Sequence, residues 1–267
     1  MRTPLITIVS GAMGMGKTYT TKKIIEDYIK KHKRNILIID INNEYRKYKE
    51  IEYKYVGYLE KNDFPSIRRV VPRRKEENID VDELTEIVYF ILNNFRNGLL
   101  VMEDLNQYIT TTNNKKIIRV LVSNRHRNLD IIVHIQSLSA LTKRLKANAF
   151  LYRMHYQIDD IYNIKDLPSE KLFMIGYSII KKRFLNGDKY FFLWIDIKKN
   201  QIIGNYKLEE FRDAVKEYYI VNKKMFKLEA EKLGINIKKE EEKEKLFNIL
   251  LKENLYYSIF RGKILYI

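Results

Sequence analysis

The chain has 267 residues, of which 45% are hydrophobic and 31% are charged, a composition typical of a folded globular protein and not of a disordered one. It contains no cysteine, which excludes disulfides and thiolate metal sites, and it has no apolar run long enough to predict a membrane span. Its 50 Lys and Arg against 34 Asp and Glu give a net charge of +16. Such a charge favours polyanionic partners, nucleic acid first and an anionic membrane surface second, although a codon bias toward Lys, Asn, Ile and Tyr would also produce it.

The first half of the chain alternates short apolar strands with amphipathic segments. Strands are expected at Leu5–Ser10, Asn35–Ile41, Leu99–Met102 and Asp130–Ile135, and helices at Lys17–Lys31, Asp80–Asn97 and Lys115–Asn124. In the second helix, Asp80 and Glu83 have the spacing of a capping box, and Gly98 has the position of a helix stop. Short parallel strands separated by helices predict an α/β fold with helices on both faces of the sheet.

The second half changes character. The expected segments are a hairpin of Lys189–Ile197 and Gln201–Tyr206, a helix at Leu208–Tyr219, and a charged helix from Asn222 to Lys245 with a break at Gly234. The end of the chain, Leu246–Ile267, regains apolar residues and is expected to dock on a surface. We therefore divide the chain into a core over residues 1–206 and a C-terminal helical extension over residues 207–267.

Gly11–Thr18 (GAMGMGKT) fits the P-loop pattern G-x-x-x-x-G-K-[ST] at every fixed position, after a strand and before a helix. Glycines let backbone N–H groups approach phosphate oxygens, and the helix N-terminus adds its dipole. We expect Lys17 to contact the β- and γ-phosphates of ATP and Thr18 to ligate Mg²⁺. The predicted nucleotide-binding residues are the whole loop: Gly11, Ala12, Met13, Gly14, Met15, Gly16, Lys17 and Thr18.

An apolar strand that ends in two acids, Leu99–Asp104 (LLVMED), matches a Walker B element. One carboxylate would orient the Mg²⁺ ion while the other activates the attacking water. Position places Glu103 on the metal and Asp104 in the base role, but side chains alternate along a strand, so the two roles could be exchanged. P-loop kinases need no adjacent water-activating carboxylate, so the pair of acids favours ATP hydrolysis.

Further polar residues surround the strand Asp130–Ile135. Gln136 follows it at the edge of the sheet where ligands bind, and could sense the γ-phosphate or position water. Arg119, Arg125 and Arg127 precede it, and a guanidinium of this kind can stabilise a transition state from a neighbouring subunit. His126 and His134 show no metal pattern and are interpreted as structural.

Two basic clusters are candidate contacts for DNA phosphates and are expected in loops or after strands. The first comprises Arg68, Arg69, Arg73, Arg74 and Lys75, and the second Lys143, Arg144 and Lys146.

Together these segments resemble the FtsK–HerA superfamily of P-loop motors. The resemblance rests on GAMGMGKT at 11–18, IIDINNEY at 38–45, LLVMED at 99–104 and SNRHRNLDIIVHIQS at 123–137, and covers about residues 1–160. It implies a RecA-like (ASCE) core, ATP and Mg²⁺ as cofactors, Gln136 as a sensor, and Arg119 or Arg125 as a finger acting in trans.

Within that group, the absence of large insertions and of a transmembrane tail favours the compact viral genome-packaging ATPases. The resemblance then implies a homo-oligomeric ring, pentamer or hexamer, that moves double-stranded DNA into a preformed capsid, with a capsid or portal-vertex protein as a further partner. The location implied is the host cytoplasm, with association with the virion as an option. Two alternatives stay open: a phage assembly or export ATPase similar to zonula occludens toxin, and an ATP-gated nucleic-acid-binding switch protein.

Overall fold

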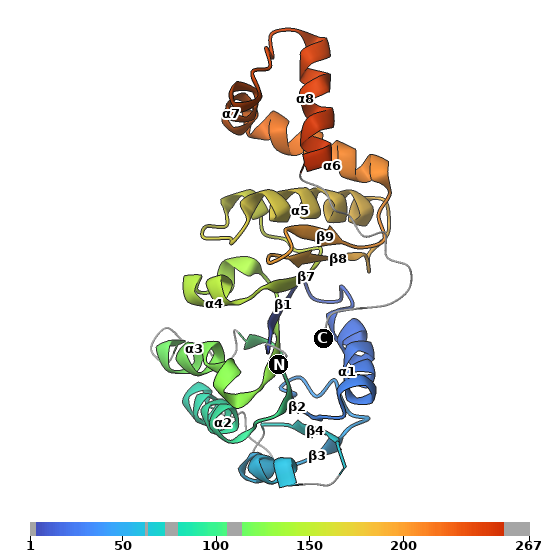
Figure 1. Ribbon diagram of the computed structural model, residues 1–267. Coiled ribbons are helices and arrows are strands. Elements are labelled where there is room, and N and C mark those ends of the chain that lie inside the picture. The colour runs from blue at the N-terminus through green and yellow to red at the C-terminus, as the bar shows by residue number, and fades with distance from the viewer. Residues whose placement is uncertain (1–3, 62–63, 73–79, 106–113, 254–267) are drawn as a thin grey trace.

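The computed structural model describes residues 4–61, 64–72, 80–105 and 114–253. Within these residues, strands form one sheet in the order β3-β4-β2-β5-β6-β1-β7-β8-β9, which runs through the centre of the molecule in Figure 1. The strands from β3 to β7 in this order are parallel, whereas β8 and β9 are antiparallel to their neighbours. This confirms the predicted RecA-like α/β fold with a mainly parallel sheet and a hairpin.

The expected strands of the first half are present as β1 (Ile6–Ser10), β2 (Asn35–Ile39), β5 (Gly98–Met102) and β6 (Asp130–Ile135). Their side chains are buried on both faces almost throughout, as expected for strands of a parallel sheet. The sheet also contains three strands that were not predicted: β3 (Lys49–Glu50), β4 (Ile67–Val70) and β7 (Leu151–His155). The hairpin consists of β8 (Phe192–Asp196) and β9 (Gln201–Ile203).

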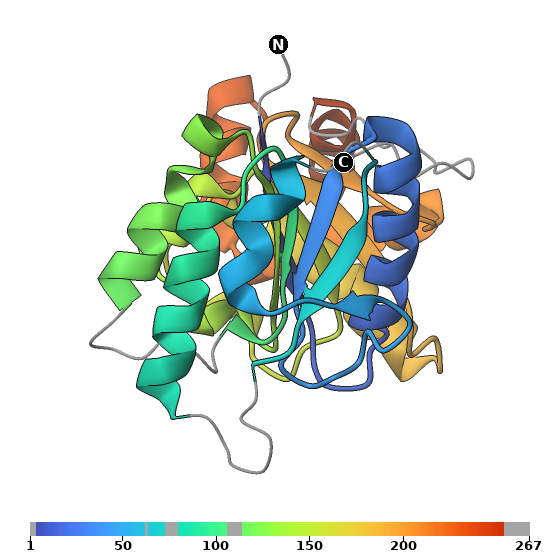
Figure 2. The same ribbon diagram turned by 90° about the horizontal axis from the view of Figure 1, so that it is seen from below.

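Two apolar clusters hold the helices on the sheet. The smaller cluster packs α1 (Lys17–His32) against one face through Ile24, Ile25 and Tyr28. The larger cluster lies on the other face and includes buried side chains of α2 (Val81–Asn94), α3 (Asn114–Val122), α4 (Lys143–Asn148) and α5 (Glu170–Leu185). Figure 2 shows α1 on one side of the strands and α2 and α3 on the other.

Short 3-10 segments connect these elements: η1 (Tyr53–Lys61), η3 (Asn124–Arg127), η4 (Leu138–Ala140) and η5 (Ile161–Asn163). The carboxyl ends of β1, β2, β5 and β6 lie at the same edge of the sheet, because these strands are parallel and adjacent. In an open α/β sheet this is the edge where ligands bind.

The C-terminal helices stack outward from the β9 end of the sheet. α6 (Leu208–Val221) packs on α5, and Figure 1 shows α7 (Lys223–Leu233) and α8 (Glu240–Glu253) beyond it. Gly234 caps α7 with a left-handed φ of 65°, which confirms the predicted break. Leu246 and Leu250 of α8 are buried in the larger cluster, so the described start of the predicted docking segment packs on its own chain. Since α6 packs directly on the core, its packing marks no domain boundary at residue 207. The division of the chain there stays a prediction.

The helix predicted over Asp80–Asn97 is shorter than expected. Asp80 is the N-cap, but its side chain makes no capping hydrogen bond, and the helix ends at Asn94. Gly98 does not stop this helix; it is the first residue of β5. A Cβ there would lie 2.4 Å from the carbonyl oxygen of Asn35 on β2, so glycine is needed for the close approach of two strands.

The described basic residues lie in regular elements and not in loops. Arg68 and Arg69 belong to β4, and the second cluster lies in α4. Arg73, Arg74 and Lys75 lie outside the described residues. No helix in the described part of the chain is long and apolar enough to cross a membrane.

Candidate nucleotide-binding site

The P-loop joins β1 to α1 at the ligand-binding edge of the sheet. Gly16 is the N-cap of α1 and has a left-handed φ of 82°, a conformation that glycine adopts without strain. The loop borders a cavity of about 500 Å³, whose other walls come from the ends of β2, β5 and β6 and from the segment before β8. The cavity therefore lies where the positive end of the α1 dipole favours an anion.

Lys17 is folded back on the P-loop. Its Nζ donates hydrogen bonds to the carbonyl oxygens of Gly11 (2.6 Å) and Ala12 (2.9 Å). Burial lowers the pKa of the Lys17 ammonium, while the nearby Asp104 and Glu103 carboxylates oppose this shift. The cation is thus desolvated beside the cavity, where its interaction with an incoming phosphate is stronger than it would be in bulk water.

Glu103 links the end of β5 to the P-loop. Its Oε1 accepts a hydrogen bond from the Thr18 hydroxyl at 3.1 Å and lies 3.3 Å from Nδ1 of His134. Burial would raise the pKa of the Glu103 carboxyl, but hydrogen bonds from His134 and Thr18 outweigh it, so the pKa lies below the ordinary value. The side chain is therefore an anion at neutral pH, directly beside the P-loop hydroxyl.

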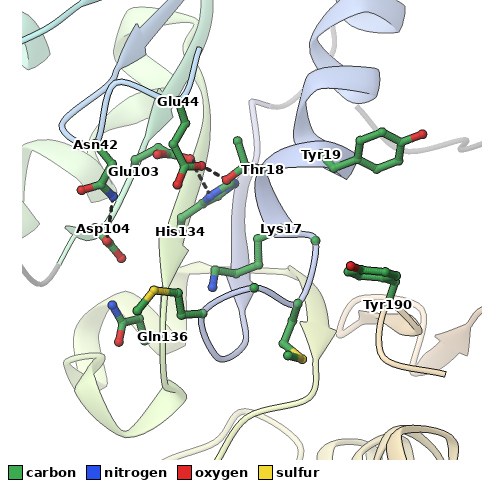
Figure 3. A pocket seen from close by; sticks show the side chains of 14 residues that line it. Lys17, Thr18, Tyr19, Asn42, Glu44, Glu103, Asp104, His134, Gln136 and Tyr190 are labelled. Carbon is green, nitrogen blue, oxygen red and sulfur yellow. Dashed lines mark hydrogen bonds and ion pairs between the residues drawn. The ribbon is translucent and has the colours of Figure 1, made fainter. Parts of the chain in front are cut away.

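Asp104 also lines the cavity, although it follows Glu103 directly in the chain. The backbone of Asp104 has a positive φ of 44°, so the alternation of the strand ends here and both carboxylates can face one space. The Asp104 Oδ2 accepts a hydrogen bond from Nδ2 of Asn42 at 3.0 Å. Figure 3 shows Asp104 beside Asn42 and Glu103 beside Thr18, so the two acids have different partners.

A buried chain of hydrogen bonds runs from Glu103 through the base of α1. Arg153 of β7 donates through Nη2 to Oγ1 of Thr21 (2.6 Å) and to the carbonyl oxygen of Lys17 (2.9 Å). Since the Thr21 oxygen accepts from Arg153, its proton is available to Nε2 of His134, 2.8 Å away. That tautomer leaves the His134 Nδ1–H to donate to Glu103.

Burial influences the protonation states of His134 and Arg153 in this series of hydrogen bonds. Burial lowers the pKa of His134 in spite of the Glu103 charge, which favours the neutral ring. Burial also lowers the pKa of the Arg153 guanidinium to about 9, so it is still a cation at neutral pH. Its ring neighbours Phe192 and Trp194 lie 5.9 and 5.5 Å from the guanidinium carbon, and cation–π attraction offsets part of the desolvation.

The donor set of Thr18 and Glu103 fits a Mg²⁺ ion that arrives with a nucleotide. Mg²⁺ prefers hard oxygen ligands and usually takes one or two from the protein, with phosphates and waters completing the octahedron. Here a hydroxyl and a carboxylate oxygen lie 3.1 Å apart at the cavity wall. These two residues would hold the ion.

The structure brings together most of the predicted site but not the arginines. Gln136 is exposed and lines the cavity, beside the P-loop. Arg119 lies on the exposed side of α3, and Arg125 lies in η3, before the start of β6. Because Gln136 follows the far end of β6, Arg125 is at the opposite edge of the sheet from its own P-loop. Arg127 instead donates to Ser123 and Asn93.

The residues predicted to contact DNA differ in how accessible their charged groups are to a phosphate. Arg69 forms an ion pair of 2.9 Å with the fully buried Asp40, and the Nζ of Lys146, which is 5% exposed, donates to the carbonyl oxygen of Lys165. Both charges are therefore used within the fold. Arg68 is half-buried on β4, and Lys143 and Arg144 are exposed on α4, where Lys143 forms an ion pair of 2.9 Å with Asp166. These three side chains are at least partly accessible.

Several cavity and support residues were missed by the sequence analysis. They are Tyr19, Asn42, Glu44, His134 and Tyr190 in the cavity wall, and Thr21 and Arg153 behind it. Two signals pointed to some of them. Asn42 and Glu44 belong to the IIDINNEY segment that was recognised, and polar residues alternate along residues 151–157 (LYRMHYQ), as in a strand with one polar face.

The family model for the central domain of the helicase HerA matches residues 8–253. Two solved structures of the genome packaging NTPase B204 from Sulfolobus turreted icosahedral virus 2, with AMP and with ATP-gammaS, each have a TM-score of 0.52 and 19% identity, covering 76% of this chain and 96% of theirs. B204, the DNA-packaging ATPase from Sulfolobus turreted icosahedral virus, has a TM-score of 0.52 and 18% identity, with coverages of 75% and 97%. No curated protein sequence matches significantly.

The N-terminal domain of zonular occludens toxin from Neisseria meningitidis has 14% identity and a TM-score of 0.35, over 57% of this chain and 76% of that one. That likeness is too low to carry an argument. The B204 structures support the RecA-like fold, and the HerA model extends through the predicted extension to Glu253. The chain therefore belongs to the HerA central-domain family within the FtsK–HerA superfamily, and it is an ATPase of that kind.

Proposed function

We propose that this chain is the subunit of an oligomeric motor that couples ATP hydrolysis to the movement of double-stranded DNA, and that its cargo is a viral genome entering a preformed capsid. The observation that carries the proposal is the contact between Thr18 Oγ1 and Glu103 Oε1 at 3.1 Å. This contact joins the P-loop to the acidic end of β5, which is the arrangement that hydrolysis of a Mg²⁺-bound nucleotide requires.

Each residue has a role in this mechanism. Lys17 leaves the carbonyl oxygens that it now contacts and binds the β- and γ-phosphates. Thr18 and Glu103 would hold Mg²⁺, which would supply positive charge beside the phosphates. Asp104, oriented by Asn42, accepts a proton from a water whose oxygen attacks the γ-phosphorus. The bond from that phosphorus to the bridging oxygen breaks, and ADP and phosphate leave.

The positions of the arginines support an oligomer. Arg125 is exposed at the edge of the sheet opposite its own P-loop, so it could reach a phosphate only in a neighbouring subunit. A head-to-tail ring of five or six subunits would bring that edge to the next site. The net charge of +16 and the exposed Lys143 and Arg144 support DNA as the polymer that is moved.

The proposal that the cargo is a viral genome is supported by the structural similarity to B204, which is described as a genome packaging NTPase. A capsid or portal-vertex protein would then be a further partner, and the motor would act in the host cytoplasm. An export ATPase of the zonula-occludens-toxin type is the alternative, but no observation favours it.

Subunit mixing tests the motor directly. Lys17→Ala subunits lack a working P-loop but keep their arginines, whereas Arg125→Ala subunits keep the P-loop. Each variant alone should hydrolyse ATP poorly with double-stranded DNA at low salt, and their mixture should recover turnover, because each supplies what the other lacks. The same mixing with Arg119→Ala decides which arginine acts.

Arg212→Ala, an exposed arginine on α6, is the control and should turn over ATP normally. Lack of recovery in mixtures with either arginine variant would contradict a finger in trans. Turnover that does not respond to DNA would contradict the translocase. Glu103→Gln combined with Asp104→Asn should abolish hydrolysis, and normal turnover in that variant would remove both acids from the mechanism.

A further inference from the structure

Two exposed tyrosines stand at one end of the P-loop cavity. Tyr19 is 64% exposed and Tyr190 is 63% exposed, and both line the cavity that contains Lys17. Figure 3 shows them on one side of the P-loop, while Glu103, Asp104 and Gln136 lie on the other. The cavity therefore has a polar end and an aromatic end, with the phosphate-binding loop between them.

Tyr190 is held in place by the backbone around it. It lies in the turn between α5 and β8, where the Asp188 N–H donates to the Arg183 carbonyl and the Phe191 N–H donates to Asp188. The Cδ1 atom of the Tyr190 ring would lie 3.2 Å from a Cβ placed on Gly16. The ring thus lies against the loop residue that caps α1, although it is not a predicted part of the P-loop.

The direction of a bound nucleotide follows from the two ends of the cavity. Its γ-phosphate must face Glu103 and Asp104, because hydrolysis occurs there under the proposed function. The triphosphate then runs along the loop N–H groups, and its base emerges at the opposite end, where the tyrosines are. An aromatic ring offers a base a stacking surface that does not depend on base identity.

A lysine ammonium lies over each of these rings. The Nζ of Lys189 is 5.6 Å from the centroid of the Tyr190 ring, and the Nζ of Lys23 is 4.5 Å from that of Tyr19. The exposed fractions of both tyrosines show that part of each ring is still accessible to a planar partner. Tyr190 is the better platform of the two, because its ring also contacts the phosphate-binding loop at Gly16.

We propose that Tyr190 is the stacking platform for the base of the bound nucleoside triphosphate, with Tyr19 bordering the same end of the cavity. This inference rests on the proposed function, since it takes the direction of the nucleotide from the position of the acids. It assigns a ligand contact to a residue outside every motif identified in the sequence.

The test separates the base from the phosphates. Isothermal titration calorimetry with Mg²⁺ measures the binding of ATP and of inorganic tripolyphosphate, which has the charge but no base. Tyr190→Ala should weaken ATP binding by about 5- to 150-fold, the loss expected for one base–aromatic stack, and leave tripolyphosphate binding unchanged. Tyr190→Trp should retain ATP binding. Tyr58→Ala removes a tyrosine of similar exposure (60%) from η1 and should change neither affinity.

Equal losses for ATP and tripolyphosphate in Tyr190→Ala would mean that the ring only supports Gly16, which overturns the inference. Unchanged ATP binding in that variant overturns it as well. In either case tight binding of both ligands by the unmodified protein would leave the proposed ATPase standing. If the unmodified protein binds neither ligand, the proposed function fails and the base site fails with it.

Discussion

We expect the stability of the protein to fall in mild acid because of His155. The side chain is fully buried on β7, with its Cβ 2.6 Å from the position of a Cβ on Gly11 and its ring 5.2 Å from that of Phe192. Burial, and after it the charges of Arg153 and Lys17, lower the pKa of His155 well below the ordinary value of 6.5. In the folded protein, His155 is therefore the neutral imidazole at neutral pH.

The sign and size follow from linkage. Below pH 6.5 the unfolded chain takes up a proton at this residue and the folded protein does not, so stability present at pH 7.5 is lost as the pH falls. Each pH unit below that point costs about 1.4 kcal/mol per such group. At pH 5.5 the loss from His155 alone is about 1.4 kcal/mol, which is a sizeable part of the roughly 5–15 kcal/mol typical of folded domains. His134, whose pKa is also lowered by burial, acts in the same direction.

Guanidinium unfolding of the nucleotide-free protein at pH 7.5 and 5.5 measures the effect. His155→Phe removes the titrating group and keeps an aromatic ring against Phe192. The unfolding free energy of this variant minus that of the original protein should be about 1.4 kcal/mol larger at pH 5.5 than at pH 7.5. His126→Phe, at an exposed histidine, is the matched control for the replacement of a histidine by phenylalanine. A difference that is the same at both pH values for His155→Phe would refute the reasoning.

Three further predictions concern contacts elsewhere in the fold. Gly98→Ala would place a Cβ 2.4 Å from a backbone oxygen of β2 and should lower the unfolding free energy by about 1–3 kcal/mol, whereas Gly57→Ala, whose nearest atom would be 3.6 Å away, should be tolerated; equal stability of the two would count against the close approach. Arg69→Met leaves the buried Asp40 without its ion pair and should cost about 3–5 kcal/mol in denaturant unfolding, while Arg68→Met, on the same strand, should cost much less. Thr18→Val removes the hydroxyl that contacts Glu103 and should reduce ATP turnover on the order of a hundredfold, with Thr18→Ser retaining most of it; activity in Thr18→Val close to that of the original protein would exclude the metal role.

The parts of the fold predicted from the sequence are those with strong local patterns. β1, β2, β5 and β6 are apolar runs buried on both faces, and such runs stand out in any sequence. β4 was not predicted because it contains two charged residues, Arg68 and Arg69. The charge of Arg69 is paired with Asp40, which comes from a distant part of the chain, so the local sequence does not indicate a buried strand. The length of α2 was overestimated for a related reason: the residue that marks a helix end in many sequences is needed here for contact with β2.

The candidate site divides in the same way. The P-loop and the acids after β5 are contiguous motifs, and their positions in the cavity follow from them. His134, Thr21 and Arg153 come from three separate elements. The registers of β6 and β7 beside β1, which pair Val9 with both His134 and Arg153, bring them together. Tyr190 likewise reaches the P-loop through the path of the α5–β8 turn, which no local pattern specifies. Contacts that depend on tertiary packing are therefore the ones that local sequence patterns did not predict.

The clamp formed by Arg153 has a mechanical consequence. Its Nη2 ties the Lys17 carbonyl and the Thr21 side chain of α1 to β7, and β7 is hydrogen-bonded to β1 and to β8. The start of α1 and these strands thus form one stiff block beneath the phosphates. The other wall of the cavity, from Asn42 to Asp104, contacts α1 through the hydrogen bond from Thr18 to Glu103 and through Lys22, whose Nζ donates to the carbonyl oxygen of Glu44 at 2.8 Å. Under the proposed function, we expect a change at the γ-phosphate to reach the ends of β2 and β5 first through these contacts, while the block around β1 and β7 stays in place.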